Sequence, residues 1–292
     1  MSRFLPFLQV DVFTDRPFLG NPVAVVLDAD RLDAAAMQRI ARWTNLSETT
    51  FVTRPSAAGA DYALRIFTPD RELPFAGHPT LGSAHAVLAT GRAQARQGRL
   101  VQQCGAGLVV LRDEPEAGLR HFQVPPARTA PVPDRELGPI AEALGIDGEA
   151  PRFEAIDVGP VWITGELPDA ATLGGLRPDS AALAAISRRL GVTGVTLHAP
   201  WPAGHRDARG RPVSVAVRSF APAAGIDEDP VCGSGNACVA VQRGAGGRRE
   251  AYCASQGEAL GRDGRIVVAW RDGRIEVGGA SIVCVEGRLR VD

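Results

Sequence analysis

The chain of 292 residues contains no lysine, so arginine and five histidines supply all of its basic side chains. An enzyme that forms a Schiff base between its own lysine and a substrate or pyridoxal phosphate is therefore excluded. A Walker A phosphate-binding loop is excluded as well, because that loop needs its lysine. The chain also lacks an excess of charge of one sign, since 33 acidic residues oppose 32 basic ones. We therefore expect neither a nucleic acid nor a membrane surface as a partner, because both require a net basic face.

The five cysteines are scattered and form no Cys-x-x-Cys pair, so we expect neither a disulfide framework nor a zinc site. The first ten residues alternate like a strand and lack the apolar run of a signal peptide. No segment approaches the roughly 18–20 apolar residues of a membrane span. These absences predict a reduced, cytoplasmic protein.

The two halves of the chain carry four similar segments in the same order. Residues 21–26 resemble 159–164, residues 40–51 resemble 186–197, residues 64–69 resemble 217–222, and residues 76–78 resemble 232–234. The spacing between partners grows along the chain, as expected of a duplicated unit whose second copy has longer loops. We therefore predict two lobes of similar α+β fold, residues 1–124 and 125–292, joined by the proline-rich segment 125–133. The last strands of the second lobe could instead pack on the first.

Apolar spacing predicts helices over residues 36–43 and 182–190. Small residues over 83–89 and 236–242, each after a glycine turn, predict two further helices that are buried against a close neighbour. Alternation predicts strands over 61–67, 99–112 and 212–220. The pairs Asp263-Gly264 and Asp272-Gly273 are typical of hairpin turns and separate the strands expected near the end of the chain.

The second glycine turn contains Gly233-Ser234-Gly235 and opens a predicted helix, whose exposed backbone N–H groups could bind an anion. A dinucleotide fingerprint is excluded, because Cys238 stands where that motif has glycine and no strand precedes the turn. The alternative is that Asp229 or Ser234 merely caps the helix.

The first glycine turn places Gly77 and His78 before a predicted helix, at the positions equivalent to Gly233 and Ser234. His78 alone could be a hydrogen-bonded turn residue. If the two repeats face each other, however, two anion-binding helix ends would hold an acidic substrate between them.

Glu48 belongs to the segment Asn45-x-x-Glu48, which could be a capping box. The β-branched residues 49–53 that follow favour a strand, however, and a capping box needs a helix there. The repeat places Gly194 opposite Glu48, so the carboxyl group is present in one copy only. Burial would raise its pKa and suit it to take and return a proton near neutral pH.

Cys232 precedes the second glycine turn, and its counterpart in the first half is Ala76. A cysteine at a helix N-terminus can have a lowered pKa and act as a base or nucleophile. A racemase site with two thiol bases would lack its second thiol here. Cys238 is expected off the same helix face as a small core residue.

At these residues the chain resembles the PhzF-like phenazine-biosynthesis isomerases, which share the diaminopimelate-epimerase-like fold. The resemblance covers roughly residues 5–290, and five segments carry it: Gly20-Asn-Pro-Val-Ala-Val, Asn45-Leu-Ser-Glu-Thr, Arg65-Ile-Phe-Thr-Pro, Leu73-Pro-Phe-Ala-Gly-His-Pro and Glu228-Asp-Pro-Val-Cys-Gly-Ser. The resemblance implies two lobes, each a mixed β-barrel around a central helix, with the active site between them. It also implies a homodimer and a reaction that uses neither cofactor nor metal.

The founding member of that family isomerises trans-2,3-dihydro-3-hydroxyanthranilate, with one glutamate that removes a proton and returns it elsewhere on the ring. By this resemblance Glu48 is the glutamate, and His78 and Asp229 position the substrate and assist protonation. The resemblance also implies that a second set of residues binds the small carboxylate substrate: Asn21, Ser47, Gly77, Gly233 and Ser234.

One position departs from the family, which commonly has threonine where this chain has Cys232. In related epimerases and proline racemases a cysteine in that turn is a catalytic base. The leading interpretation is an isomerase of a small amino or hydroxy carboxylic acid that uses Glu48. The alternatives are an epimerase, racemase or dehydratase that uses Cys232 with Glu48, and a non-catalytic protein that binds small acids.

Overall fold

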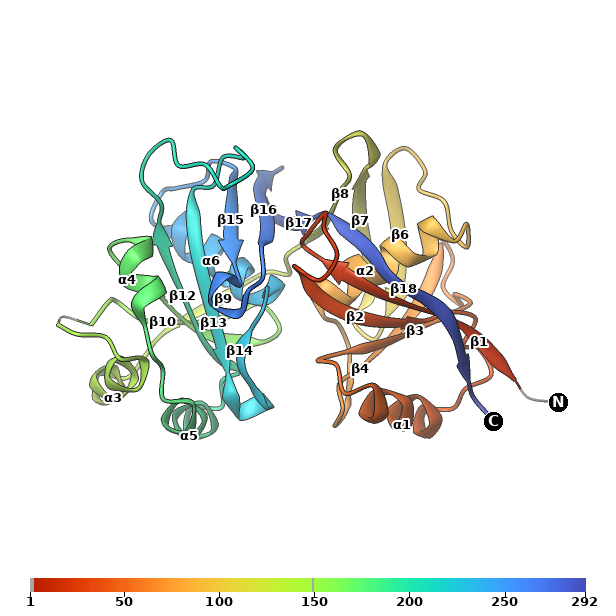
Figure 1. Cartoon of the computed structure of the whole chain (residues 1–292), viewed down its shortest axis with the longest axis horizontal. Helices are drawn as coiled ribbons and strands as arrows, with labels where there is room; N and C mark the ends of the chain where they lie inside the picture. Colours follow the sequence, from red (N-terminus) through yellow and green to blue (C-terminus); the bar gives the residue numbers. More distant parts are fainter. Residues whose placement is uncertain (1–2, 149) are drawn as a thin grey trace. The chain divides into compact units, whose positions relative to one another are not determined.

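The computed structural model describes residues 3–148 and 150–292 and divides the chain into two compact units. Unit 1 consists of Met1–Gln123 and Gly278–Asp292, and unit 2 of Val124–Val277. The division expected from the sequence placed residues 125–292 in the second lobe and left open that the last strands pack on the first. Residues 278–292 belong with unit 1 because the last strand, β18 (Ser281–Arg290), pairs antiparallel with the first, β1 (Phe4–Val12). The two strands run side by side in Figure 1.

Unit 1 contains two α-helices, a short 3₁₀ turn and the strands of a mixed sheet. After β1 they are β2 (Asn21–Val26), α1 (Ala34–Thr44), β3 (Thr49–Thr53), β4 (Tyr62–Phe67), β5 (Glu72–Leu73), α2 (Gly77–Ala89), β6 (Arg99–Cys104), β7 (Gly107–Glu114), η1 (Pro115–Ala117) and β8 (Leu119–Gln123). The strand β2 pairs antiparallel with β1 and parallel with β3, and β4 pairs antiparallel with β3 and parallel with β6.

Unit 2 repeats this plan with two additional helices. Its elements are β9 (Arg128–Pro131), α3 (Asp134–Leu144), β10 (Glu154–Asp157), β11 (Val161–Glu166), α4 (Ala170–Gly175), α5 (Ser180–Leu190), β12 (Gly194–Pro200), β13 (Val215–Ala221), η2 (Pro222–Ala224), β14 (Ile226–Asp229), α6 (Gly233–Ala245), β15 (Tyr252–Gln256), η3 (Glu258–Leu260), β16 (Gly264–Arg271) and β17 (Arg274–Gly279), whose last two residues fall in unit 1.

Strand pairing in unit 2 follows the order seen in unit 1. The strand β11 pairs antiparallel with β10 and parallel with β12, and β13 pairs antiparallel with β12 and parallel with β15. Thr50 pairs with Ile66 in unit 1, and Thr196 pairs with Ser219 in unit 2. These are the positions that the sequence repeat equates, so the two units share one topology. The α+β class is confirmed, whereas the closure of each unit into a barrel stays a prediction.

The helices α2 and α6 are buried on most of their surface, with nine of 13 residues buried in each. The helix α2 packs on β1, β2 and β18, and α6 on β10, β11, β12 and β16. Small residues allow this close approach. A Cβ at Gly82 would lie 2.4 Å from Cγ1 of Val23, and one at Gly235 would lie 2.6 Å from Oγ of Ser219. The expectation of small-residue helices packed against close neighbours is therefore confirmed.

Some local expectations were wrong. The strand expected over 99–112 is a hairpin of β6 and β7, turned at residues 105–106. The linker over 125–133 contains β9, which pairs with β10. Asp263-Gly264 is the end of a longer connection that includes η3, whereas Asp272 and Gly273 do form a two-residue turn with φ of 51° and 75°. Neither α3 nor α4 was expected.

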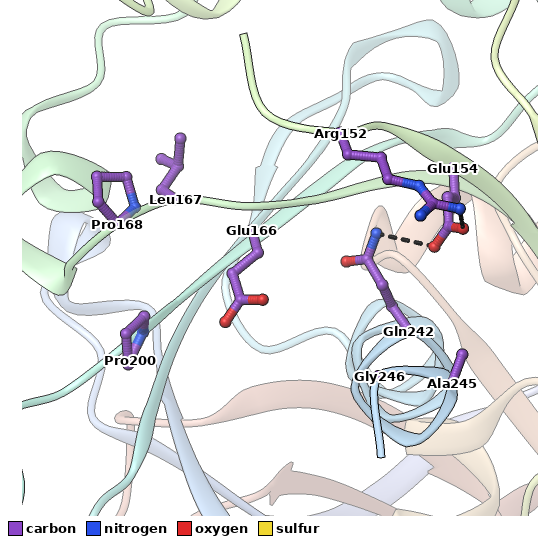
Figure 2. Close-up of a pocket in the computed structure, with 9 residues that line it drawn as sticks. All are labelled: Arg152, Glu154, Glu166, Leu167, Pro168, Pro200, Gln242, Ala245 and Gly246. Carbon is purple, nitrogen blue, oxygen red and sulfur yellow. Dashed lines mark hydrogen bonds and ion pairs between the residues drawn. The ribbon is translucent and has the colours of Figure 1, made fainter. Parts of the chain in front are cut away.

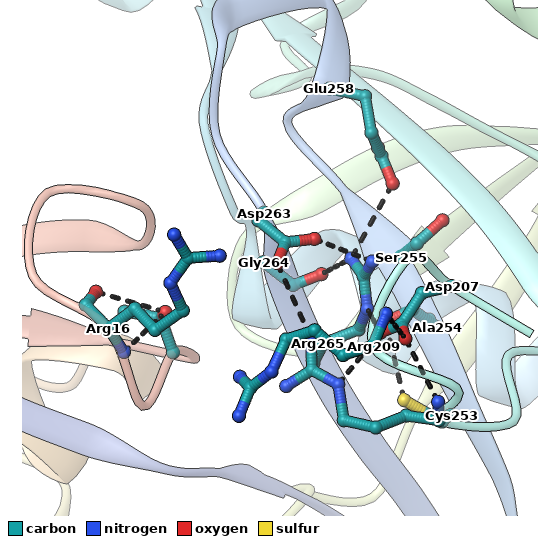
Figure 3. A network of polar contacts seen from close by, with 12 residues as sticks. Arg16, Asp207, Arg209, Cys253, Ala254, Ser255, Glu258, Asp263, Gly264 and Arg265 are labelled. Atoms are coloured by element: carbon teal, nitrogen blue, oxygen red, sulfur yellow. Dashed lines mark hydrogen bonds and ion pairs between the residues drawn. The ribbon is translucent and has the colours of Figure 1, made fainter.

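A network of charged side chains holds the loop between β12 and β13 in unit 2 (Figure 3). The carboxylate of Asp207 accepts hydrogen bonds from the backbone N–H groups of Arg209 and Arg211 and from the guanidinium groups of Arg211 and Arg265. Arg265 also contacts Asp263 at 2.6 Å. Burial acts to raise the pKa of Asp207, but these hydrogen bonds outweigh it and hold the pKa well below its usual range. Each charge in this network has a partner, which indicates a structural role.

Among the residues that the structure describes, no helix has the length and apolar character needed to span a membrane.

Candidate active site

The turn that carries Glu48 is fixed by the end of α1. This helix begins after Asp33, whose carboxylate accepts a hydrogen bond from the N–H of Ala36 at 2.7 Å. It ends at Asn45, which adopts the left-handed conformation with φ of 54°. The hydroxyl groups of Thr44 and Thr49 lie 2.6 Å apart and close the turn. Since Asn45 ends a helix and a strand follows Glu48, the capping-box interpretation is wrong.

Glu48 lies immediately before β3, with only 15% of its side chain exposed. Burial raises the pKa of its carboxyl group from 4.5 to about 7, although the Ser47 hydroxyl acts in the opposite direction. Within the described residues, Oε2 of Glu48 and Oγ of Ser47 are buried and make no hydrogen bond of good geometry, although Ser47 lies close enough to act on the pKa of the carboxyl group. Buried polar atoms are normally paired, so these two indicate a place for a polar group that is not part of the protein.

His78 faces Glu48, with Nε2 at 3.5 Å from Oε2. It occupies the first turn of α2, which starts at Gly77 and has no side-chain cap at Ala76. Gly77 allows the ring of Phe122 to pack on the helix, because a Cβ there would lie 2.6 Å from Cζ of Phe122. The structure thus brings the side chains of Glu48 and His78 together.

Asn21 is the first residue of β2 and is 2% exposed. The residue before it, Gly20, donates its N–H to the buried carboxylate of Asp11 at 3.2 Å. A Cβ at Gly20 would lie 2.3 Å from the carbonyl oxygen of Val12, so only glycine fits this entry to the strand. The Gly-Asn-Pro motif therefore has a structural reason for its glycine, and it fixes the position of Asn21 in unit 1.

Unit 2 carries the second group of predicted site residues, around the start of α6. Oδ1 of Asp229 accepts the N–H of Val231 at 3.0 Å, and the carbonyl of Asp229 accepts the side-chain amide of Gln256 at 3.1 Å. Oε1 of Gln256 accepts the N–H of Cys232 at 3.1 Å and the side-chain amide of Asn236 at 2.8 Å. Gln256 is fully buried and was missed in the sequence analysis. It ties the Asp229 turn to the first turn of α6.

Cys232 is the N-terminal cap of α6, since its Sγ accepts the N–H of Gly235 at 3.3 Å. The expectation that Asp229 or Ser234 supplies the cap was wrong. Burial, together with the charge of Asp229, raises the pKa of the thiol well above its usual value. The lowered pKa considered for a thiol at a helix N-terminus was therefore wrong in direction, and Cys232 carries its proton at neutral pH. Cys238 is fully buried in the core, as expected.

Ser234 follows in the first turn of α6, and its hydroxyl oxygen accepts the indole N–H of Trp162 at 3.0 Å. Oγ of Ser234 also lies 3.5 Å from Sγ of Cys232. Trp162 was not predicted as a site residue, although the repeat places an alanine, Ala24, at the equivalent position of the first half. Because Glu48 and His78 lie in unit 1 and the Asp229–Ser234 group in unit 2, their convergence on one cleft stays a prediction.

A separate pocket of about 680 Å³ in unit 2 contains none of the predicted site residues (Figure 2). Its carboxylates are already paired. Glu154 accepts hydrogen bonds from Arg152 at 2.9 Å and from Gln242 at 3.1 Å. Glu166 is held by both terminal nitrogens of Arg248. Both carboxylates in the described lining of this pocket therefore have partners already, and the Glu48 group remains the better candidate.

A family model described as "Phenazine biosynthesis-like protein" matches residues 10–287. The chain belongs to the phenazine biosynthesis-like family. A trans-2,3-dihydro-3-hydroxyanthranilate isomerase of Pseudomonas chlororaphis is 37% identical over 84% of this chain and 81% of that protein. The "Antisense-enhancing sequence 1" protein of Schizosaccharomyces pombe is 37% identical over 97% of both chains. A family member of Enterococcus faecalis, known as a crystal structure, superimposes with a TM-score of 0.77 at 29% identity and covers 98% of this chain and 99% of its own.

Membership of the phenazine biosynthesis-like family makes the chain an enzyme of the isomerase class. The resemblance found in the sequence is thereby confirmed at the level of the family.

Proposed function

We propose that this enzyme is a cofactor-independent isomerase of a small amino or hydroxy carboxylic acid, with Glu48 as its acid–base group. The observation that carries the proposal is the burial of the Glu48 carboxyl group and its effect on the pKa of that group. Its carboxyl group is buried beside His78, and its pKa is raised to about 7. Such a group is present in both protonation states at neutral pH, so it can accept a proton and return it.

The reaction moves one proton and leaves the composition of the substrate unchanged. The Glu48 carboxylate takes a proton from one carbon, and the electron pair of the broken C–H bond shifts into the neighbouring π-system. The resulting carboxylic acid then delivers the same proton to a different carbon. The relative from Pseudomonas chlororaphis is named for trans-2,3-dihydro-3-hydroxyanthranilate, which makes this compound the first trial substrate.

In this proposal His78 and Asp229 hold the amine and hydroxyl groups of the substrate and assist protonation. The remaining predicted residues bind its carboxylate and its ring, and they are Asn21, Ser47, Gly77, Gly233 and Ser234. Support comes from the buried Oε2 of Glu48 and Oγ of Ser47, which make no hydrogen bond of good geometry within the described residues, and from the turn at the start of α6 that Gln256 holds in place. Closure of each unit into a mixed barrel around its buried helix, a homodimer and a cytoplasmic location belong to the same proposal.

The experiment is solvent-deuterium incorporation into the trial substrate, followed by mass spectrometry and by product formation. The Glu48→Gln variant should lose both exchange and turnover by at least about 100-fold, the usual minimum for a general acid–base group. The Glu286→Gln variant is the matched control, since Glu286 is an exposed glutamate of unit 1. Intact exchange and turnover in Glu48→Gln would refute the mechanism. Tight binding of substrate without exchange in the wild type would favour the non-catalytic binding protein instead.

The alternative that uses Cys232 as a base is disfavoured by its raised pKa and by its role as a helix cap. A direct comparison of Cys232→Thr with Cys232→Ser decides it. Threonine can cap the helix but has no thiol. Full activity in the threonine variant would remove the thiol from the chemistry, whereas loss of activity in both variants, with folding intact, would restore the alternative.

A further inference from the structure

Trp162 lies in β11 of unit 2 and is 2% exposed. Its indole N–H donates a hydrogen bond to Oγ of Ser234 at 3.0 Å. An indole nitrogen can only donate, so the hydroxyl oxygen of Ser234 must be the acceptor. This direction leaves the hydroxyl proton of Ser234 for a different acceptor.

Oγ of Ser234 also lies 3.5 Å from Sγ of Cys232, which can accept this proton. That sulfur already accepts the N–H of Gly235 at 3.3 Å, and a thiol sulfur is a weak acceptor. The proton of Ser234 is therefore held loosely. A carboxylate would take it in a stronger, charge-assisted hydrogen bond.

The tryptophan occurs in one copy of the repeat only. Matching residues 159–164 to residues 21–26 places Ala24 of unit 1 opposite Trp162, and alanine has no donor. Both residues are buried in equivalent strands, β2 and β11. Because unit 1 forms the same topology around an alanine, the fold does not require tryptophan at this position. The difference between Trp162 and Ala24 therefore indicates that the tryptophan has a role at the start of α6, where it contacts Ser234.

We propose that Trp162 is a positioning residue, which fixes the Ser234 hydroxyl as a hydrogen-bond donor to the carboxylate of the substrate. This inference rests on the proposed function, because it concerns how the same substrate is held. The N-terminal N–H groups of α6 add to the attraction for an anion. The neighbouring Asp229 favours an acid that also carries an amine or hydroxyl group. The substrate class is thus a small acid with its carboxylate directed to α6.

The test compares two probes that differ by the carboxylate alone. Calorimetric titration of the whole protein measures the Kd of 3-hydroxyanthranilate and of 2-aminophenol, with wild type, Trp162→Phe, Ser234→Ala and the double variant. Trp162→Phe should weaken binding of 3-hydroxyanthranilate about three- to tenfold, as loss of one hydrogen bond implies, and leave 2-aminophenol unchanged. In the Ser234→Ala background the same change should have no further effect, because the group that Trp162 orients is gone.

Trp201→Phe is the matched control, because the Trp201 indole also donates to a serine, Ser255, at 3.0 Å in the same unit. It should leave both Kd values at the wild-type level. Thermal unfolding of each variant reports folding separately, and a loss of stability alone does not change the ratio between the two probes. In turnover assays Trp162→Phe should raise KM by a similar factor, with kcat nearly unchanged.

Three results would overturn the inference. They are equal weakening of both probes in Trp162→Phe, independent effects of Trp162→Phe and Ser234→Ala, and wild-type binding that does not prefer the carboxylate. Deuterium exchange is measured separately and depends on Glu48. Exchange without carboxylate preference refutes the role of Trp162 alone, whereas carboxylate preference without exchange refutes the proposed isomerase reaction alone.

Discussion

Replacing Glu48 with glutamine should inactivate the enzyme and raise its free energy of unfolding above that of the wild type. This difference in the free energy of unfolding should grow with pH. The folded chain raises the pKa of this carboxyl group from 4.5 to about 7, chiefly through burial. Below the lower value the group is protonated in both the folded and the unfolded chain. As the pH rises between the two values, the unfolded chain releases the proton first, so the free energy of unfolding falls. From pH 5 to pH 8 the linkage relation gives a loss of about 2–3 kcal/mol in the wild type.

Glutamine has nearly the same shape and does not titrate, so the stability difference between Glu48→Gln and wild type should widen by that amount. Hydrogen–deuterium exchange of peptides from β3 measures the opening of unit 1 by itself. Both proteins are compared at the same pH, which cancels the intrinsic pH dependence of exchange. Glu286→Gln, at an exposed glutamate, should show no such widening. A difference that stays constant with pH, or that grows toward acid, would refute the assignment of a raised pKa to Glu48.

Further predictions concern the backbone of unit 2. Gly194→Ala should lower the free energy of unfolding by about 3 kcal/mol, because the added Cβ would lie 2.0 Å from the carbonyl oxygen of Phe220. Gly174→Ala, at an exposed helical position with open space around it, should raise that free energy by a few tenths of a kcal/mol, and urea denaturation distinguishes the two. Cys232→Ala should cost about 1 kcal/mol, because the N–H of Gly235 loses its acceptor, and Cys232→Thr should recover most of it. An unchanged melting temperature in Cys232→Ala would contradict the capping role.

Much of the topology could be predicted because the two halves of the chain carry similar segments in the same order. The repeat located equivalent strands, and the pairing of Thr50 with Ile66 and of Thr196 with Ser219 confirms the equivalence. The break between β6 and β7 was missed, although Gly105 and Gly107 interrupt the strand pattern of residues 99–112 and glycine is typical of turns. A contact across unit 1 decides that turn, since a Cβ at Gly105 would lie 2.8 Å from Cα of Pro74. The helix α3 was hidden by Pro139, which lies inside it.

Part of the candidate site could also be predicted from the sequence repeat. Glu48 stood out because its counterpart is Gly194, and Gly194 in turn is required by its close approach to Phe220. The sequence placed Cys232 at a helix N-terminus correctly but gave the wrong direction for the pKa of its thiol. The burial that raises this pKa and the hydrogen bond that Sγ accepts from the N–H of Gly235 depend on the folded structure. The role of Gln256 could not be predicted from the sequence, because only the folded structure shows that this buried glutamine bridges two turns.

The pairing of β18 with β1 has a consequence for the order of folding during synthesis. Nascent chains ordinarily fold their N-terminal parts first. Here the final strand emerges last, and it supplies one neighbour of the first strand along nearly its whole length. Unit 2, which is continuous from Val124 to Val277, leaves the ribosome entire before unit 1 is complete. The strand β1 therefore has one edge without its partner strand until β18 has been synthesised.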